Sequence, residues 1–165
     1  MHRFILTSRW RLQASAEQVW TLLTAIEEWP RWWRYVRAAR IESRGGTNHV
    51  GDVARIDWGS ALAYGVHLRV TTTHAERPRH LEGRADGDLN GRGVWLIEPA
   101  DGATVDVTYR WDVELRRPWM RRLAPLLRPL FEWNHFVVMR AGARGMAERL
   151  GCRLSGLREW SGAAR

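Results

Sequence analysis

The feature that most constrains the fold of this chain is a strict alternation of apolar and polar side chains along residues 105–115. The apolar members are Val105, Val107, Tyr109, Trp111, Val113 and Leu115. A period of two predicts a β-strand with one face in a hydrophobic core and the other in water. Turn-forming clusters separate similar segments upstream at spacings of about 8–14 residues. Residues 36–115 are therefore expected to form an antiparallel meander of about six strands joined by hairpins.

Helical patterns lie on both sides of this strand region. Residues 3–12 favour a first strand, after which Ser15 and Gln18 have the spacing of an N-terminal capping box. Apolar residues then repeat at helical spacing, and Pro30 ends or restarts the helix. A short second helix is therefore expected in residues 29–36.

The C-terminal third of the chain predicts one long helix. Residues 118–150 begin with a proline, which favours the first helical position, and a kink or restart is expected at Pro125 and Pro129. The expected apolar stripe consists of Leu123, Leu127, Leu130, Phe131, Asn134, Val138, Ala141 and Gly145. Glycine is costly inside a helix, so we expect Gly142 and Gly145 to let the helix approach the sheet closely.

This order of elements predicts an α+β fold. The simplest arrangement is a curved antiparallel sheet of six to seven strands wrapped around the long C-terminal helix, with two short helices after the first strand. The length of 165 residues suits a single domain, which we assign to residues 1–153, and residues 154–165 are expected to form a loose polar tail. A sheet that does not contact the helix everywhere leaves a space between the two.

Composition excludes several classes of protein. The chain has no lysine, which excludes a Walker-type phosphate loop and lysine Schiff-base chemistry. Cys152 is the single cysteine, which excludes an internal disulfide and favours the reducing cytoplasm as the location. No apolar run approaches the ~20 residues of a membrane span, and residues 1–12 lack a secretory signal, so an integral membrane protein is not expected.

Tryptophan is unusually frequent, with 11 residues against three tyrosines and three phenylalanines. Because the side chain is large and carries one donor, this excess suits a wide aromatic-lined interior. The net charge of +8 comes with arginine as the only basic side chain besides histidine, a pattern that GC-rich coding explains. Most tryptophans fall on core-like positions, so a nucleic-acid partner is not expected.

Three segments carry a resemblance to a known family. Residues 10–33 combine an apolar strand, a Val-Trp helix and a W-P-x-W-W turn; residues 87–96 are similar to a G-x-L-x-G-x-G-x-W strand pair; and residues 133–142 begin a helix with W-N-H. In this order they resemble the START-like helix-grip (SRPBCC) superfamily, and within it the polyketide cyclase/dehydrase group. The resemblance implies a central cavity for a lipid, a sterol, a polyketide-like chain or another aromatic molecule. It implies no catalytic residue, because the superfamily includes aromatase/cyclases, carriers and receptors.

The expected ligand-binding residues lie on the strands, the short helix and the long helix: Trp33, Trp58, Trp95, Tyr109, Trp111, Phe131, Asn134 and Val138. The alternative for each is plain core packing. Trp33 has the further alternative of covering the cavity mouth from the short helix. Asn134 needs hydrogen-bond partners on an apolar stripe, and either a ligand or the protein itself can supply them.

Catalysis is the second hypothesis. Tyr109, Asn134 and His135 are the candidates for proton transfer in a cyclase, aromatase or dehydratase acting in the same cavity. Glu132 and His135 have the spacing of a di-iron motif, but no second copy exists, and the other histidines show no ligand spacing. We therefore expect no metal and no cofactor.

A third hypothesis rests on the arginines at the start of the long helix, namely Arg116, Arg117, Arg121 and Arg122. Cations there oppose the helix dipole, so the sequence must gain from them elsewhere or simply tolerate them as solvated charge. An acidic carrier protein or an anionic surface is the partner that such a docking module would meet.

Overall fold

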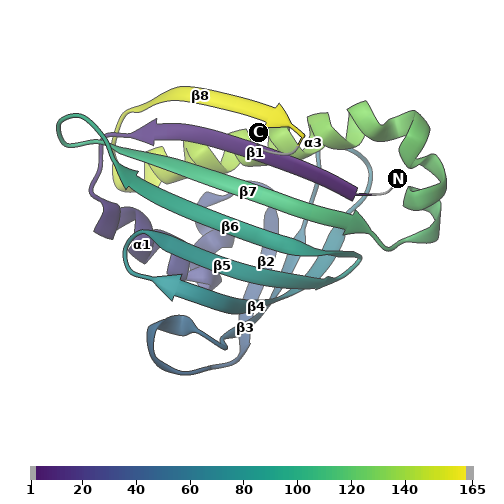
Figure 1. Ribbon diagram of the computed structural model, residues 1–165, viewed down its shortest axis with the longest axis horizontal. Helices are drawn as coiled ribbons and strands as arrows, with labels where there is room; N and C mark the ends of the chain where they lie inside the picture. Colours follow the sequence, from purple (N-terminus) through teal and green to yellow (C-terminus); the bar gives the residue numbers. More distant parts are fainter. Residues whose placement is uncertain (1–2, 163–165) are drawn as a thin grey trace.

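The computed structural model describes residues 3–162. It contains one eight-stranded antiparallel sheet in the order β2-β3-β4-β5-β6-β7-β1-β8. The strands are β1 (Arg3–Leu12), β2 (Val36–Ser43), β3 (Val53–Trp58), β4 (Val66–Glu76), β5 (His80–Gly87), β6 (Leu89–Pro99), β7 (Val105–Leu115) and β8 (Leu154–Ser161). The helical elements are α1 (Ala16–Thr24), η1 (Ile26–Glu28), α2 (Trp29–Trp32), η2 (Thr47–His49) and α3 (Pro118–Leu150). Figure 1 shows the sheet curving so that β2 and β3 lie behind its front strands, with α3 behind β1 and β8. The predicted α+β arrangement is confirmed.

The first helix begins as the sequence predicts. The Ser15 hydroxyl oxygen accepts from the Gln18 backbone N–H (3.2 Å), and the Gln18 side chain accepts from the Ser15 backbone N–H (2.9 Å), which completes the capping box. The helix stops at Thr24, a 3₁₀ turn follows, and α2 restarts with Pro30 in its first turn. The restart matters for function because it turns the tryptophans of residues 29–33 toward the interior.

Strand β7 lies inside the sheet, paired with β6 on one side and β1 on the other. Its alternation holds with one exception, because Asp106, expected on the solvated face, is only 7% exposed. Arg11 and Arg9 cover it, each with a nitrogen 2.7 Å from a carboxylate oxygen. Hydrogen bonds from Arg11 and then Arg9 lower the pKa of Asp106 to about 2 and keep the carboxylate charged.

The C-terminal segment differs from its prediction as a loose tail, which is wrong for residues 154–161. These residues form β8, which pairs with the free edge of β1 and makes the sheet eight-stranded rather than six- to seven-stranded. The Arg140 guanidinium of α3 donates to both carboxylate oxygens of Glu159 at 2.6–3.0 Å, which fixes the strand against the helix.

The long helix α3 is continuous over the predicted range, with Pro125 and Pro129 inside it. Its first turns bend out of line with the remainder beyond the end of the sheet (Figure 1). The predicted apolar stripe is wrong at Leu123 and Leu130, which are 41% and 38% exposed. The buried positions are Met120, Ala124, Phe131, Asn134, Val138, Met139, Gly142, Ala143, Gly145, Met146 and Ala147.

The two helix glycines face α2 rather than the sheet. A Cβ atom on Gly145 would lie 1.9 Å from the carbonyl oxygen of Trp32, and one on Gly142 would lie 2.5 Å from the ring of Trp33. The expected close approach is therefore real, but it is made with the short helix. This contact holds the tryptophan-rich turn against α3.

Candidate functional site

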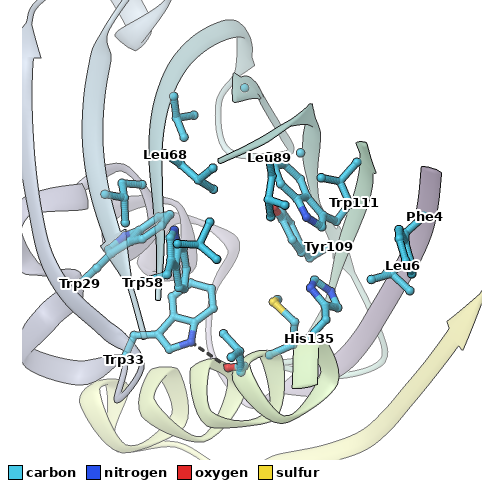
Figure 2. Close-up of a pocket in the computed structure, with 18 of the residues that line it drawn as sticks. Phe4, Leu6, Trp29, Trp33, Trp58, Leu68, Leu89, Tyr109, Trp111 and His135 are labelled. Carbon is cyan, nitrogen blue, oxygen red and sulfur yellow. Dashed lines mark hydrogen bonds between the residues drawn. The ribbon is translucent and has the colours of Figure 1, made fainter. Parts of the chain in front are cut away.

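A cavity of about 190 Å³ lies between the inner face of the sheet and α3. Figure 2 shows Trp29, Trp33 and Trp58 on one side of it and Tyr109, Trp111 and His135 on the other. Its lining is mostly apolar and aromatic, which is typical of a site for a small hydrophobic molecule.

The structure places all of the predicted ligand-binding residues in the lining of this cavity. They are Trp33, Trp58, Trp95, Tyr109, Trp111, Phe131, Asn134 and Val138. The strand residues reach the cavity because they occupy inward-facing positions of a period-two pattern, and the α3 residues because they share one helix face. Whether each contacts a ligand remains a prediction.

Trp33 occupies the inner wall of the cavity, so the alternative that it covers the mouth is wrong. It is 1% exposed, and its indole N–H donates to the Val138 carbonyl oxygen at 2.9 Å (Figure 2). Its ring centroid lies 4.9–6.1 Å from those of Trp29, Trp32, Trp58 and Trp95. Such pairs favour tilted and edge-to-face geometry, so the cluster forms a rigid aromatic surface.

Asn134 has two partners within the protein. Its side-chain oxygen accepts from the Ala61 backbone N–H (2.8 Å), and its side-chain nitrogen donates to the Tyr64 hydroxyl (3.2 Å). Both partners belong to the loop between β3 and β4, so the amide ties this loop to α3. The protein itself therefore satisfies the Asn134 amide, as the alternative to a ligand contact requires.

The two remaining catalytic candidates, Tyr109 and His135, are polar members of the cavity wall, which also includes Tyr64, Thr72, Glu82 and Asn134. Ring centroids of Tyr109 and His135 are 6.4 Å apart and nearly parallel. The His135 Nε2 atom is buried and has no hydrogen-bond partner among residues 3–162. Gly93 leaves room for the phenol, since a Cβ there would lie 2.7 Å from the Tyr109 hydroxyl oxygen.

Burial keeps both of these groups neutral at physiological pH. It lowers the pKa of His135 to about 3 and raises the pKa of Tyr109 well above its ordinary value of 10. A neutral imidazole has one donor and one acceptor nitrogen, and a phenol can donate and accept. The pair can therefore bind a hydroxyl or carbonyl group without placing a charge in the cavity.

Several lining residues were not predicted, and Tyr64 is the most informative. Tyr64 precedes β4, which begins at Val66, and lies in a loop held by Asn134 and Ser60. Leu68 and Val70 also line the cavity. Their alternation with Val66 was the available signal, whereas nothing in the local sequence marks Tyr64.

The described residues contain one group suited to holding a metal ion, formed by His74, Glu76 and His80. One ligand atom from each lies within 4.8 Å of the others, because the β4–β5 hairpin places Glu76 opposite His80. The spacing of the histidines in the sequence does not reveal this group, because pairing between the two strands of the hairpin brings its members together. Leu81 lines the cavity, so its neighbour His80 faces the other side of the sheet.

The arginines at the start of α3 divide into two kinds. Arg117 donates to Asp88 at 2.5 Å and to the Gly65 carbonyl at 3.1 Å, which fixes the start of the helix to two loops. Arg116, Arg121 and Arg122 are exposed and form no ion pair within residues 3–162.

Within the described residues, 3–162, no helix has the length and apolar character needed to cross a bilayer.

A curved antiparallel sheet closed over a long C-terminal helix, with an aromatic cavity between them, defines the helix-grip class of START-like proteins. The family model for polyketide cyclase / dehydrase and lipid transport matches residues 3–151. The chain belongs to this family. No curated protein sequence matches it.

Solved structures show the same fold at low sequence identity. The START superfamily protein from Mycobacterium smegmatis has a TM-score of 0.74 and 14% identity, covering 90% of this chain and 97% of that chain. The Zhui aromatase/cyclase from a Streptomyces species has a TM-score of 0.75 and 15% identity, covering 91% and 94%. A protein from Thermus thermophilus has a TM-score of 0.68 and 20% identity, covering 88% and 96%. These likenesses concern the fold, which does not fix the function.

Proposed function

We propose that this protein binds a small aromatic molecule that carries a hydroxyl or carbonyl group. The observation that carries the proposal is the pairing of an aromatic cavity wall with the neutral polar groups of Tyr109 and His135. Members of the family typically bind hydrophobic ligands or act as polyketide cyclases.

The volume of the cavity favours a ligand of one or two rings. A dry apolar cavity of about 150 Å³ accommodates benzene, whereas drug-sized ligands occupy roughly 300–1,000 Å³. At about 190 Å³ the cavity is closer to the first case. Among the lipid, sterol and polyketide-like classes, the small aromatic end of the polyketide-like class therefore fits best without rearrangement.

The buried His135 Nε2 atom provides the directional contact. An unpaired polar atom in an apolar site costs roughly 1–3 kcal/mol, and a ligand hydroxyl or carbonyl that pairs with it removes this cost. The tryptophan wall opposite supplies apolar contact for the rings. A ligand with a ring system at one end and a polar atom at the other satisfies both sides.

The test is titration calorimetry with 1-naphthol, with naphthalene as the probe that lacks the polar atom. Leu68→Trp places a large ring in the cavity, and we expect it to weaken naphthol binding at least tenfold. Leu96→Trp is the matched control, because Leu96 is 36% exposed and absent from the cavity lining. No naphthol binding by the wild-type protein, or equal binding by Leu68→Trp, would overturn the proposal.

A second candidate function is cyclisation of a poly-β-keto thioester. In that reaction a base removes a proton between two carbonyls, the carbanion attacks a third carbonyl carbon, and an acid protonates the resulting alkoxide. Tyr109 and His135 are the groups in the cavity that favour this candidate. However, a base is most effective when its pKa is near the working pH, and burial lowers the pKa of His135 to about 3. We therefore rank binding above catalysis.

The variant Tyr109→Phe separates the two candidates. A cyclising enzyme that uses the phenol is expected to lose at least a hundredfold in turnover of the thioester, because it loses a proton donor. Naphthol binding to the same variant should weaken less than tenfold, since the ring remains. Turnover by the wild-type protein that is unchanged in Tyr109→Phe would exclude the phenol from catalysis.

A further inference from the structure

The outward face of α3 carries a ridge of large apolar side chains in water. The exposed fractions are 41% for Trp119, 41% for Leu123, 78% for Leu126, 38% for Leu130 and 47% for Trp133. Five of the nine exposed large hydrophobic residues in the described part of the chain are in this group. Scattered apolar residues need no explanation, but a contiguous apolar patch marks an interaction site.

The spacing makes these residues one continuous surface. They follow each other at intervals of four, three, four and three residues, so they line a single side of the helix. Four of the five precede a buried position by one residue, as Trp119 precedes Met120 and Leu123 precedes Ala124, and Leu126 precedes the partly buried Leu127. The inward series packs on the sheet, whereas the outward side chains stay largely in water among residues 3–162.

The unpaired charge around this ridge has a single sign. Residues 116–133 contain five arginines and one acidic residue, Glu132. Arg117 and Arg128 pair with Asp88 and Glu132, which leaves the side chains of Arg116, Arg121 and Arg122 free of ion pairs within residues 3–162. Arg122 is three residues after Trp119 and four before Leu126, so it stands on the ridge itself.

We infer that the ridge docks the protein onto an anionic lipid bilayer. We call this surface the α3 ridge: Trp119, Leu123, Leu126, Leu130 and Trp133, with Arg116, Arg121 and Arg122. Tryptophan and leucine on one face of a helix with flanking arginine is the composition of a helix that lies in the membrane interface. Arginines near an anionic leaflet are attracted to it, and tryptophan favours the headgroup region.

A second copy of this chain is a less suitable partner for the α3 ridge than an anionic bilayer. Pairing two α3 ridges would bring the unpaired arginines of both copies together, and the acidic residue within the ridge, Glu132, is already paired with Arg128. An acidic carrier protein matches the charge. Yet Leu126 is 78% exposed, whereas a protein partner is typically anchored by side chains in well-packed pockets.

The α3 ridge also adjoins the cavity, which links docking to the proposed function. The Trp119 ring contacts Tyr64 and Phe131, with centroids 5.9 and 6.4 Å apart, and both of these residues line the cavity. When the ridge lies in the interface, this end of the cavity faces lipid rather than water. A hydrophobic ligand can then enter or leave from the bilayer, a step that rests on the proposed function.

The experiment is co-sedimentation of the full chain with vesicles of phosphatidylcholine mixed with phosphatidylglycerol, beside vesicles of phosphatidylcholine alone. We expect binding to the mixed vesicles that is at least tenfold stronger than to the neutral ones and that weakens with added salt. Leu126→Glu should weaken it at least tenfold. Leu157→Glu, at a 38% exposed position on β8, is the matched control and should bind as the wild type does.

Two outcomes overturn the inference. They are no binding to anionic vesicles and equal binding by Leu126→Glu, and in the first case arginine-dependent binding to an acidic carrier protein would identify that protein as the partner. Naphthol titration without vesicles keeps the two proposals apart, because Leu126 does not line the cavity and Leu126→Glu should retain naphthol affinity within twofold. Vesicle binding without naphthol binding would reject the ligand, and the reverse result would reject the docking surface.

Discussion

Replacing Gly145 with alanine is expected to lower the free energy of unfolding by about 3 kcal/mol. Alanine is the better helix former by about 1 kcal/mol, so local propensity alone predicts the opposite sign. The tertiary contact decides, because the added Cβ would lie 1.9 Å from the carbonyl oxygen of Trp32. That oxygen belongs to the backbone of α2, which cannot rotate away, so α2 and α3 must separate.

Urea unfolding followed by circular dichroism measures this effect. Arg144→Ala, at the adjacent exposed position, is the control and should change stability by less than about 0.5 kcal/mol. Gly142→Ala should have an intermediate cost, since its obstacle is the Trp33 ring rather than backbone. Because that ring lines the cavity, we also expect Gly142→Ala to weaken naphthol binding. A Gly145→Ala protein as stable as the wild type would show that the helices are free to move apart.

The parts of the fold that could be predicted are those with a clear period or a local hydrogen-bond code. The alternation in β7, the capping box at Ser15 and the restart at Pro30 each depend on neighbouring residues alone. The predicted start of the strand region at residue 36 matches the start of β2. Local rules were sufficient at these positions because the tertiary structure does not override them.

Segment 154–161 could not be recognised as a strand because its side chains do not alternate between core and water. Most of them are exposed, so no buried face marks the period. Its conformation is set by the unpaired edge of β1 and by the contact between Arg140 and Glu159, both distant in sequence.

The stripe on α3 failed for a different reason. Leucine and other apolar residues occupy two helical faces that differ by one position, or about 100° around the axis at 3.6 residues per turn. Periodicity gives the same signal for both faces, and Leu123 and Leu130 were assigned to the wrong one. The same ambiguity concealed the α3 ridge, since an apolar face expected in the core is not considered as a surface.

The aromatic lining of the cavity was predictable because strand parity and helix spacing place those side chains inside. The polar contacts of the chain could not be predicted in this way. Asn134 bonds to Tyr64, which is 70 residues away in sequence. On the other face of the sheet, Glu76 lies opposite His80 only because the two strands of a hairpin pair. Contacts of this kind depend on register, which a single sequence does not display.

Acidification from pH 6.5 to 4.5 is expected to destabilise the wild-type protein by about 2 kcal/mol through His135 alone. Burial lowers the pKa of His135 from an ordinary value of 6.5 to about 3 in the folded state. Below pH 6.5 the unfolded chain therefore takes up a proton that the folded chain excludes until about pH 3, and stability falls as the pH falls. The carboxylates act in the same direction but later, because the pKa of Asp106 moves only from 3.8 to about 2.

Urea midpoints measured between pH 7 and pH 4.5 test this prediction with two variants. His135→Gln keeps a polar side chain but cannot titrate, so its stability should be nearly constant over that range. Tyr109→Phe alters the neighbouring ring and leaves His135 in place, so it should retain the wild-type slope. A constant wild-type midpoint would mean that the folded protein accepts a proton at His135. The imidazolium would then need an acceptor for its Nε2–H, and residues 3–162 provide none at hydrogen-bond distance. The cavity wall would therefore have to rearrange. In that case the proposed contact between His135 and a ligand would be wrong as well.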